Sequence, residues 1–177
     1  MADIIFKTKD DVTDSWVQYI ENESRSLAQR DEFAIQNYAD REILNPAVQS
    51  YLETIDDDGD DIVGEAFAKS AGNVAMMTTE LEGFQLNYAQ EVQWLALPEW
   101  LRFRFRRIKK KVQKIFCAVA GELIDGGELD IKGIIKAVLL ALIPAFASGL
   151  PAAVFSIIIG LVAYLLKYGY TKTCPAN

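Results

Sequence analysis

Residues 131–168 read IKGIIKAVLLALIPAFASGLPAAVFSIIIGLVAYLLKY, and this stretch limits the folds that the chain can adopt. Within it, thirty consecutive residues from Ala137 to Leu166 carry no charged side chain. A straight helix of that length would measure about 45 Å, whereas the hydrocarbon core of a bilayer is about 30 Å thick. Pro144 and the Gly149-Leu150-Pro151 turn also interrupt the run. The stretch therefore predicts apolar helix that is broken near its middle.

Two membrane arrangements fit this pattern. In the first, a single span starts near residue 146 or 151 and ends at residue 166, with Tyr164, Tyr168 and Tyr170 at the interface. In the second, residues 131–147 and 151–168 form a helical hairpin whose arms are each about 24–27 Å long. The hairpin accounts for more of the residues. Its predicted membrane-inserting residues are Ile134, Leu139, Leu142, Phe146, Phe155, Ile158, Leu161 and Leu165.

A buried core is the competing interpretation of the same stretch. A helix that is apolar on all sides can lie at the centre of a soluble bundle, although 177 residues leave few to cover it. The two interpretations combine if soluble helices enclose the hairpin until it is activated. Over roughly residues 100–170, this layout resembles the principle of helical pore-forming proteins of the colicin type.

A basic amphipathic helix is predicted from about residue 99 to 124. An apolar stripe that begins at Leu101 and Phe105 occupies one side, and bases occupy most of the remaining circumference. Such a helix is typical of an anionic membrane surface, where each base contributes about 1 kcal/mol. The alternatives are docking on the acidic half of the same chain and, less favoured, nucleic-acid binding. The predicted lipid-binding residues are Trp100, Arg102, Arg104, Arg106, Arg107, Lys109, Lys110, Lys111 and Lys114.

The charge of the chain is divided between its two parts. Residues 1–100 hold 21 acids and 6 bases, whereas residues 101–177 hold 4 acids and 12 bases. Apolar residues in the first part recur at helical spacing, with stripes over 16–43, 48–55 and 66–95, and Pro46 is expected to end the first of them. Only residues 3–8 suggest a strand. The prediction is an all-α protein with an acidic helical region, 1–97, and a membrane-active region, 98–177.

Enzyme and metal functions find little support. Histidine is absent, which removes the commonest general base and most zinc sites, and no nucleotide-binding or nucleophile motif is present. Residues 54–65 read TIDDDGDDIVGE, which places Gly59 and Glu65 at EF-hand positions, but Thr54 stands where the first acidic ligand belongs. A solvated acidic loop is the favoured interpretation. We expect no catalytic residues, no metal and no cofactor.

The two cysteines and the N-terminus predict that the chain is synthesised in the cytoplasm. Cys117 and Cys174 stand far apart without metal or disulfide spacing, so both are expected to be free thiols. The N-terminus becomes acidic early and lacks the pattern of a secretory signal. The chain is therefore expected to be synthesised in the cytoplasm and to associate with or insert into a membrane.

The function expected from these patterns is membrane permeabilisation by a non-enzymatic, self-assembling effector or toxin-like protein. The acidic half would mask the basic helix and the apolar hairpin until anionic lipid, low pH, proteolysis or a regulatory protein relieved the contact. One alternative is a C-terminally anchored adaptor that binds a basic partner. Another is a soluble helical oligomer that uses the hairpin as its interface.

Overall fold

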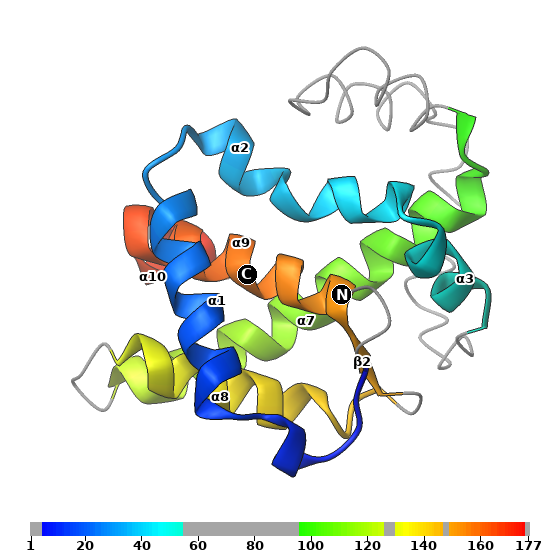
Figure 1. Ribbon diagram of the computed structural model, residues 1–177. Coiled ribbons are helices and arrows are strands. Elements are labelled where there is room, and N and C mark those ends of the chain that lie inside the picture. The colour runs from blue at the N-terminus through cyan, green and yellow to red at the C-terminus, as the bar shows by residue number, and fades with distance from the viewer. Residues whose placement is uncertain (1–4, 55–95, 126–129, 147–148, 176–177) are drawn as a thin grey trace.

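The computed structural model describes residues 5–54, 96–125, 130–146 and 149–175, and their arrangement is all-α, as predicted. Figure 1 shows the helices gathered around one central helix. The elements are β1 (Ile5–Phe6), η1 (Lys9–Asp11), α1 (Asp14–Leu27), α2 (Glu32–Gln36), η2 (Tyr38–Leu44), α3 (Pro46–Thr54), α7 (Glu99–Asp125), α8 (Ile131–Leu142), β2 (Leu150–Pro151), α9 (Ala152–Tyr168) and α10 (Tyr170–Thr173).

The first helical stripe forms three elements instead of one. The Thr13 side chain accepts a hydrogen bond from the backbone N–H of Trp16 and begins α1. The Asp31 side chain then accepts one from Ala34 at 2.8 Å and begins α2, which explains why the chain does not continue as a single helix to residue 43. Pro46 begins α3 instead of ending a helix, because a first-turn residue needs no N–H donor.

A short two-stranded sheet connects the N-terminus to the start of α9. β1 pairs antiparallel with β2, with Phe6 opposite Leu150, so the suggested strand near residues 3–8 is confirmed over two residues. Phe6 packs edge-on against Phe155 with ring centroids 4.7 Å apart. The N-terminal segment therefore covers the start of α9. The ring centroids of Trp16 and Phe155 also lie 5.4 Å apart.

The two predicted arms differ from each other. α8 ends at Leu142, two residues before Pro144, so the first arm is shorter than the predicted 131–147. It is amphipathic, since Lys132 and Lys136 are exposed on its outer side while six apolar residues face inward. It packs chiefly on α7 and α1, and its contact with α9 is slight. Within the described residues the region is not a tightly packed hairpin.

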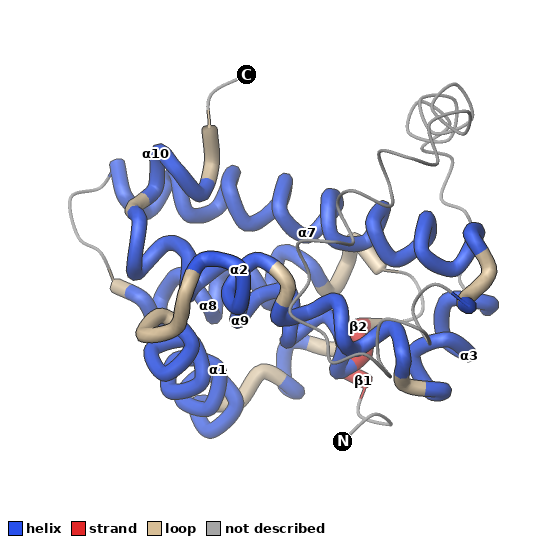
Figure 2. The backbone as a smooth tube through the Cα atoms, turned by 90° about the horizontal axis from the view of Figure 1, so that it is seen from above, coloured by secondary structure: helices blue, strands red, loops and turns tan. Residues whose placement is uncertain are grey.

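α9 is the centre of the core. α1, α2, η2, α7 and α10 all contact it, and in Figures 1 and 2 it runs through the middle of the bundle. Ile157, Ile158 and Ile159 are three consecutive residues and each is at most 4 % exposed. Because consecutive helix residues point about 100° apart, burial of all three means that α9 is covered on several sides. The arrangement matches the buried-core interpretation of this helix.

Candidate functional site

The residues predicted to insert into a membrane all lie in the protein interior or at its edge. Seven of the eight are buried, and Leu161 is half-buried. Phe155, Ile158 and Leu165 lie on α9, whereas Ile134, Leu139 and Leu142 lie on α8. The fold therefore brings these side chains together as one apolar core. Within the described part of the chain, no helix combines the length and the apolar character needed to cross a membrane.

Polar groups of α9 are bound by the acidic N-terminal region. The Ser156 hydroxyl donates to a Glu42 carboxylate oxygen at 3.1 Å. The Tyr164 hydroxyl donates to Glu32 at 2.9 Å. Burial raises the pKa of Tyr164, and the bond to Glu32 raises it further. These bonds satisfy polar atoms that would otherwise be buried without partners, and they tie α9 to α2 and η2.

The C-terminal end of α9 has a similar attachment. The Lys167 ammonium donates to the backbone carbonyl oxygen of Arg30, in the turn between α1 and α2. Tyr168, the last residue of α9, packs against Tyr164 with the two rings tilted and their centroids 4.6 Å apart. Three attachments from the first 42 residues therefore follow one side of the central helix.

The basic amphipathic helix is present as α7 and extends one residue beyond its predicted end. Its predicted apolar stripe is buried at Leu101, Phe105, Ile108, Val112 and Phe116. Leu123, which lies on the same stripe near the end of the helix, is 40 % exposed. The helix is thus a packed element of the bundle along most of its length.

Three of the predicted lipid-binding cations bind other parts of the protein. Arg104 donates to the Leu52 carbonyl oxygen at 2.6 Å, at the end of α3. Lys111 donates to the Ala145 carbonyl oxygen at 2.7 Å. Lys109 forms a 2.9 Å ion pair with the buried Asp40 of η2. The contacts of Arg104 and Lys109 are to the acidic N-terminal region, as in the alternative in which the basic helix docks on the acidic half of the chain. Lys111 instead contacts the C-terminal apolar region.

The other predicted lipid-binding residues divide by exposure. Trp100 is 42 % exposed, and Lys110 and Lys114 are also exposed. Arg102, Arg106 and Arg107 are half-buried. Burial lowers the pKa of Arg102; Glu99 opposes that change, and Arg106 adds to it. The outward side of α7 therefore presents fewer cations than the sequence predicts.

The prediction of free thiols was wrong. Cys117 of α7 and Cys174 form a disulfide, with Cα atoms 5.6 Å apart across a separation of 57 residues. Folding brings the C-terminal segment back onto α7, and the spacing along the chain gave no indication of this contact. Other bonds reinforce it, because the Tyr170 hydroxyl donates to the Cys117 carbonyl oxygen at 3.1 Å.

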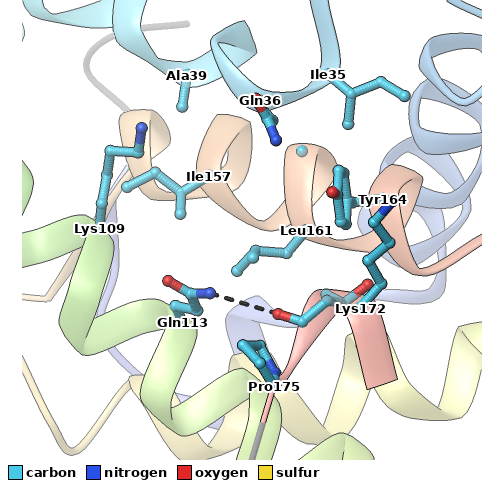
Figure 3. A pocket seen from close by; sticks show the side chains of 12 residues that line it. Ile35, Gln36, Ala39, Lys109, Gln113, Ile157, Leu161, Tyr164, Lys172 and Pro175 are labelled. Carbon is cyan, nitrogen blue, oxygen red and sulfur yellow. Dashed lines mark hydrogen bonds between the residues drawn. The ribbon is translucent and has the colours of Figure 1, made fainter. Parts of the chain in front are cut away.

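A cavity of about 300 Å³ opens between α2, η2, α7, α9 and the C-terminal segment. Figure 3 shows its apolar side, formed by residues such as Ile157 and Leu161, and polar side chains around it. Gln113 donates to the Thr173 carbonyl oxygen at 3.4 Å across one edge. α9 is only partly covered here, since Gly160 and Leu161 are half-buried.

The described ranges bear on the metal prediction but not on catalysis. Among those residues, no group of three or more histidine, cysteine, aspartate or glutamate side chains is placed to hold a metal ion. The EF-hand-like loop at 54–65 and the helical stripe at 66–95 lie outside the described residues, apart from the end of α3. No protein-family model, curated protein or solved structure matches the chain.

Proposed function

We propose that the protein is a membrane-permeabilising, non-enzymatic effector that stores its insertable helix, α9, inside a helical bundle. The observation that carries this proposal is the burial of α9 on several sides combined with its attachment to the acidic region through Ser156 and Tyr164. A helix this apolar is stable either within protein or within lipid. Its enclosure by the surrounding helices and a short two-stranded sheet is consistent with a stored form.

The outward side of α7 would make the first contact with anionic lipid. Arg107, Lys110 and Lys114 follow one another at helical spacing and share a face. Trp100 lies at the N-terminal end of the same helix, with the Arg104 guanidinium 5.0 Å from its ring centroid. Exposed cations contribute about 1 kcal/mol each near such a surface, so two lysines correspond to roughly a thirtyfold change in affinity.

The decisive experiment combines vesicle binding with dye release. Full-length protein, incubated with and without dithiothreitol, is mixed with dye-loaded vesicles of phosphatidylcholine, with and without phosphatidylserine. We expect binding and dye release only with the anionic lipid. The variant Lys110→Glu/Lys114→Glu should bind at least about thirtyfold more weakly. Lys132→Glu/Lys136→Glu is the matched control, because it makes the same charge change on exposed lysines of α8.

The alternatives give different results in the same assay. An anchored adaptor would bind vesicles without releasing dye, and its membrane fraction would survive a carbonate wash. A soluble helical oligomer would ignore lipid and elute as a multimer without detergent. Equal losses in both lysine variants would show that net charge alone governs binding, which contradicts the assignment of α7 as the contact surface.

A further inference from the structure

The Cys117–Cys174 disulfide encloses the whole apolar region in one covalent loop. Both α8 and α9 lie between the two cysteines, which are 57 positions apart. Cys117 is half-buried on α7, and Cys174 is 9 % exposed just after α10. The loop therefore begins on a helix that packs against α9 and ends six residues beyond the last residue of α9.

Within the described residues, two hydrogen bonds join the C-terminal segment to α7. The Tyr170 hydroxyl donates to the Cys117 carbonyl oxygen at 3.1 Å, and Gln113 donates to the Thr173 carbonyl oxygen at 3.4 Å. Gly121 lets Tyr170 approach α7, since a Cβ at that position would lie 2.7 Å from the Tyr170 hydroxyl. Single hydrogen bonds of this kind hold a segment weakly. The disulfide is thus the strongest attachment of the C-terminal segment to α7 within the described residues.

We propose that Cys117–Cys174 is a site of thiol–disulfide exchange with a dithiol reductant, and that its reduction releases α9; this rests on the proposed function. A reductant thiolate attacks one cysteine sulfur, breaks the S–S bond and forms a mixed disulfide. The second reductant thiol then displaces that cysteine. The protein gains two electrons and two protons as two thiols, and the reductant leaves as its disulfide.

The disulfide also restricts the membrane topology of the released region. Residues 117 and 174 stay within 5.6 Å at their Cα atoms while the bond is intact, so both must lie on one side of a membrane. The segment between them can then cross an even number of times only. The oxidised chain is restricted to a two-arm insertion, and a single span that carries the C-terminus across requires reduction.

Release is tested first without lipid, by hydrogen exchange of the α9 amides in the full chain. Loop-closure entropy for a loop of this length corresponds to about a thousandfold change in the equilibrium constant for opening. We therefore expect exchange about a thousandfold faster after reduction and alkylation with iodoacetamide. The Cys117→Ser/Cys174→Ser variant should exchange at the fast rate with or without reductant. Equal rates in oxidised and reduced protein would overturn the proposal.

Dye release from anionic vesicles then distinguishes the proposed redox control of α9 from the proposed membrane-permeabilising function. Oxidised protein should release little dye, whereas reduced protein and the double serine variant should release it readily. Fast exchange with no dye release by any form would overturn the proposed function and support the disulfide as a control of α9. Dye release that is equal in oxidised and reduced protein would overturn the redox control and support the function. Lys172→Gln is the control for changes near the junction, and its dye release should depend on reductant as in the unmodified protein.

Discussion

Truncating Lys109 should cost much more stability than truncating Asp40, although the two side chains form one ion pair. The Asp40 side chain is 3 % exposed, whereas the Lys109 side chain is 30 % exposed. The second carboxylate oxygen of Asp40, Oδ2, is buried without a hydrogen-bond partner. In Lys109→Ala the carboxylate would therefore remain buried with its charge uncompensated. In Asp40→Ala the flexible ammonium can turn toward water.

The expected magnitudes follow from this asymmetry. Removing one partner of a buried pair typically costs about 3–5 kcal/mol, and the partial exposure of Lys109 favours the lower end, about 3 kcal/mol. Asp40→Ala should cost about 1 kcal/mol, which is typical of a lost hydrogen bond to a group that can reach solvent. The double variant should be more stable than Lys109→Ala alone, because it removes the stranded carboxylate.

Urea unfolding followed by circular dichroism measures these differences. With an m value of about 2–3 kcal/mol/M, Lys109→Ala should lower the midpoint by roughly 1 M. Lys110→Ala is the matched control, because Lys110 is the next residue along α7 and its side chain is exposed. This variant should change the free energy of unfolding by less than about 0.5 kcal/mol. Equal costs for the two single variants, with additive effects in the double variant, would refute the reasoning.

Other variants test the packing and titration of the central helices. Burial raises the pKa of Tyr164 above its ordinary 10.0, so its neutral form contributes stability that is present below that pH and lost as pH rises through the folded-state pKa. Tyr164→Phe should therefore lose less stability between about pH 9 and 11 than the unmodified protein, and identical pH profiles would contradict this assignment. Gly160→Ala should lower stability by about 1–2 kcal/mol, because its Cβ would lie 3.3 Å from the Ile35 carbonyl oxygen; a raised melting temperature would argue against this tight contact. Leu139→Ala should cost about 2–5 kcal/mol in urea, whereas the exposed neighbour Leu140→Ala should cost less than about 0.5 kcal/mol, and similar costs would contradict the orientation of α8.

The helices were predictable where one local pattern dominates. The amphipathic pattern of residues 99–124 corresponds to α7, and the apolar run after Pro151 corresponds to α9. The period predicts these helices because apolar residues that recur every three to four positions share one face, and a packed helix buries that face. It was less successful over residues 28–45, where the cap at Asp31 and a 3₁₀ segment divide the stripe.

The partners of the charged side chains were not predictable in the same way. Eight cations in α7 look equivalent along the chain, yet Lys109 pairs with Asp40, 69 residues away, while Lys110 is exposed. The difference depends on which element lies beside each side chain. The disulfide is a similar case, because only the return of the C-terminal segment onto α7 brings Cys174 to Cys117.

By itself, the sequence determined that the chain is all-α, that its charge is divided, and that residues after Pro151 must leave water. These properties follow from local composition and helical period, which act over a few residues. Only the tertiary structure decided what surrounds α9: helices from the acidic region, α7, and a C-terminal segment joined by a disulfide. The physical reason is that the hydrophobic effect has no direction. It requires the burial of α9, but shape and hydrogen-bond complementarity select the groups that cover it.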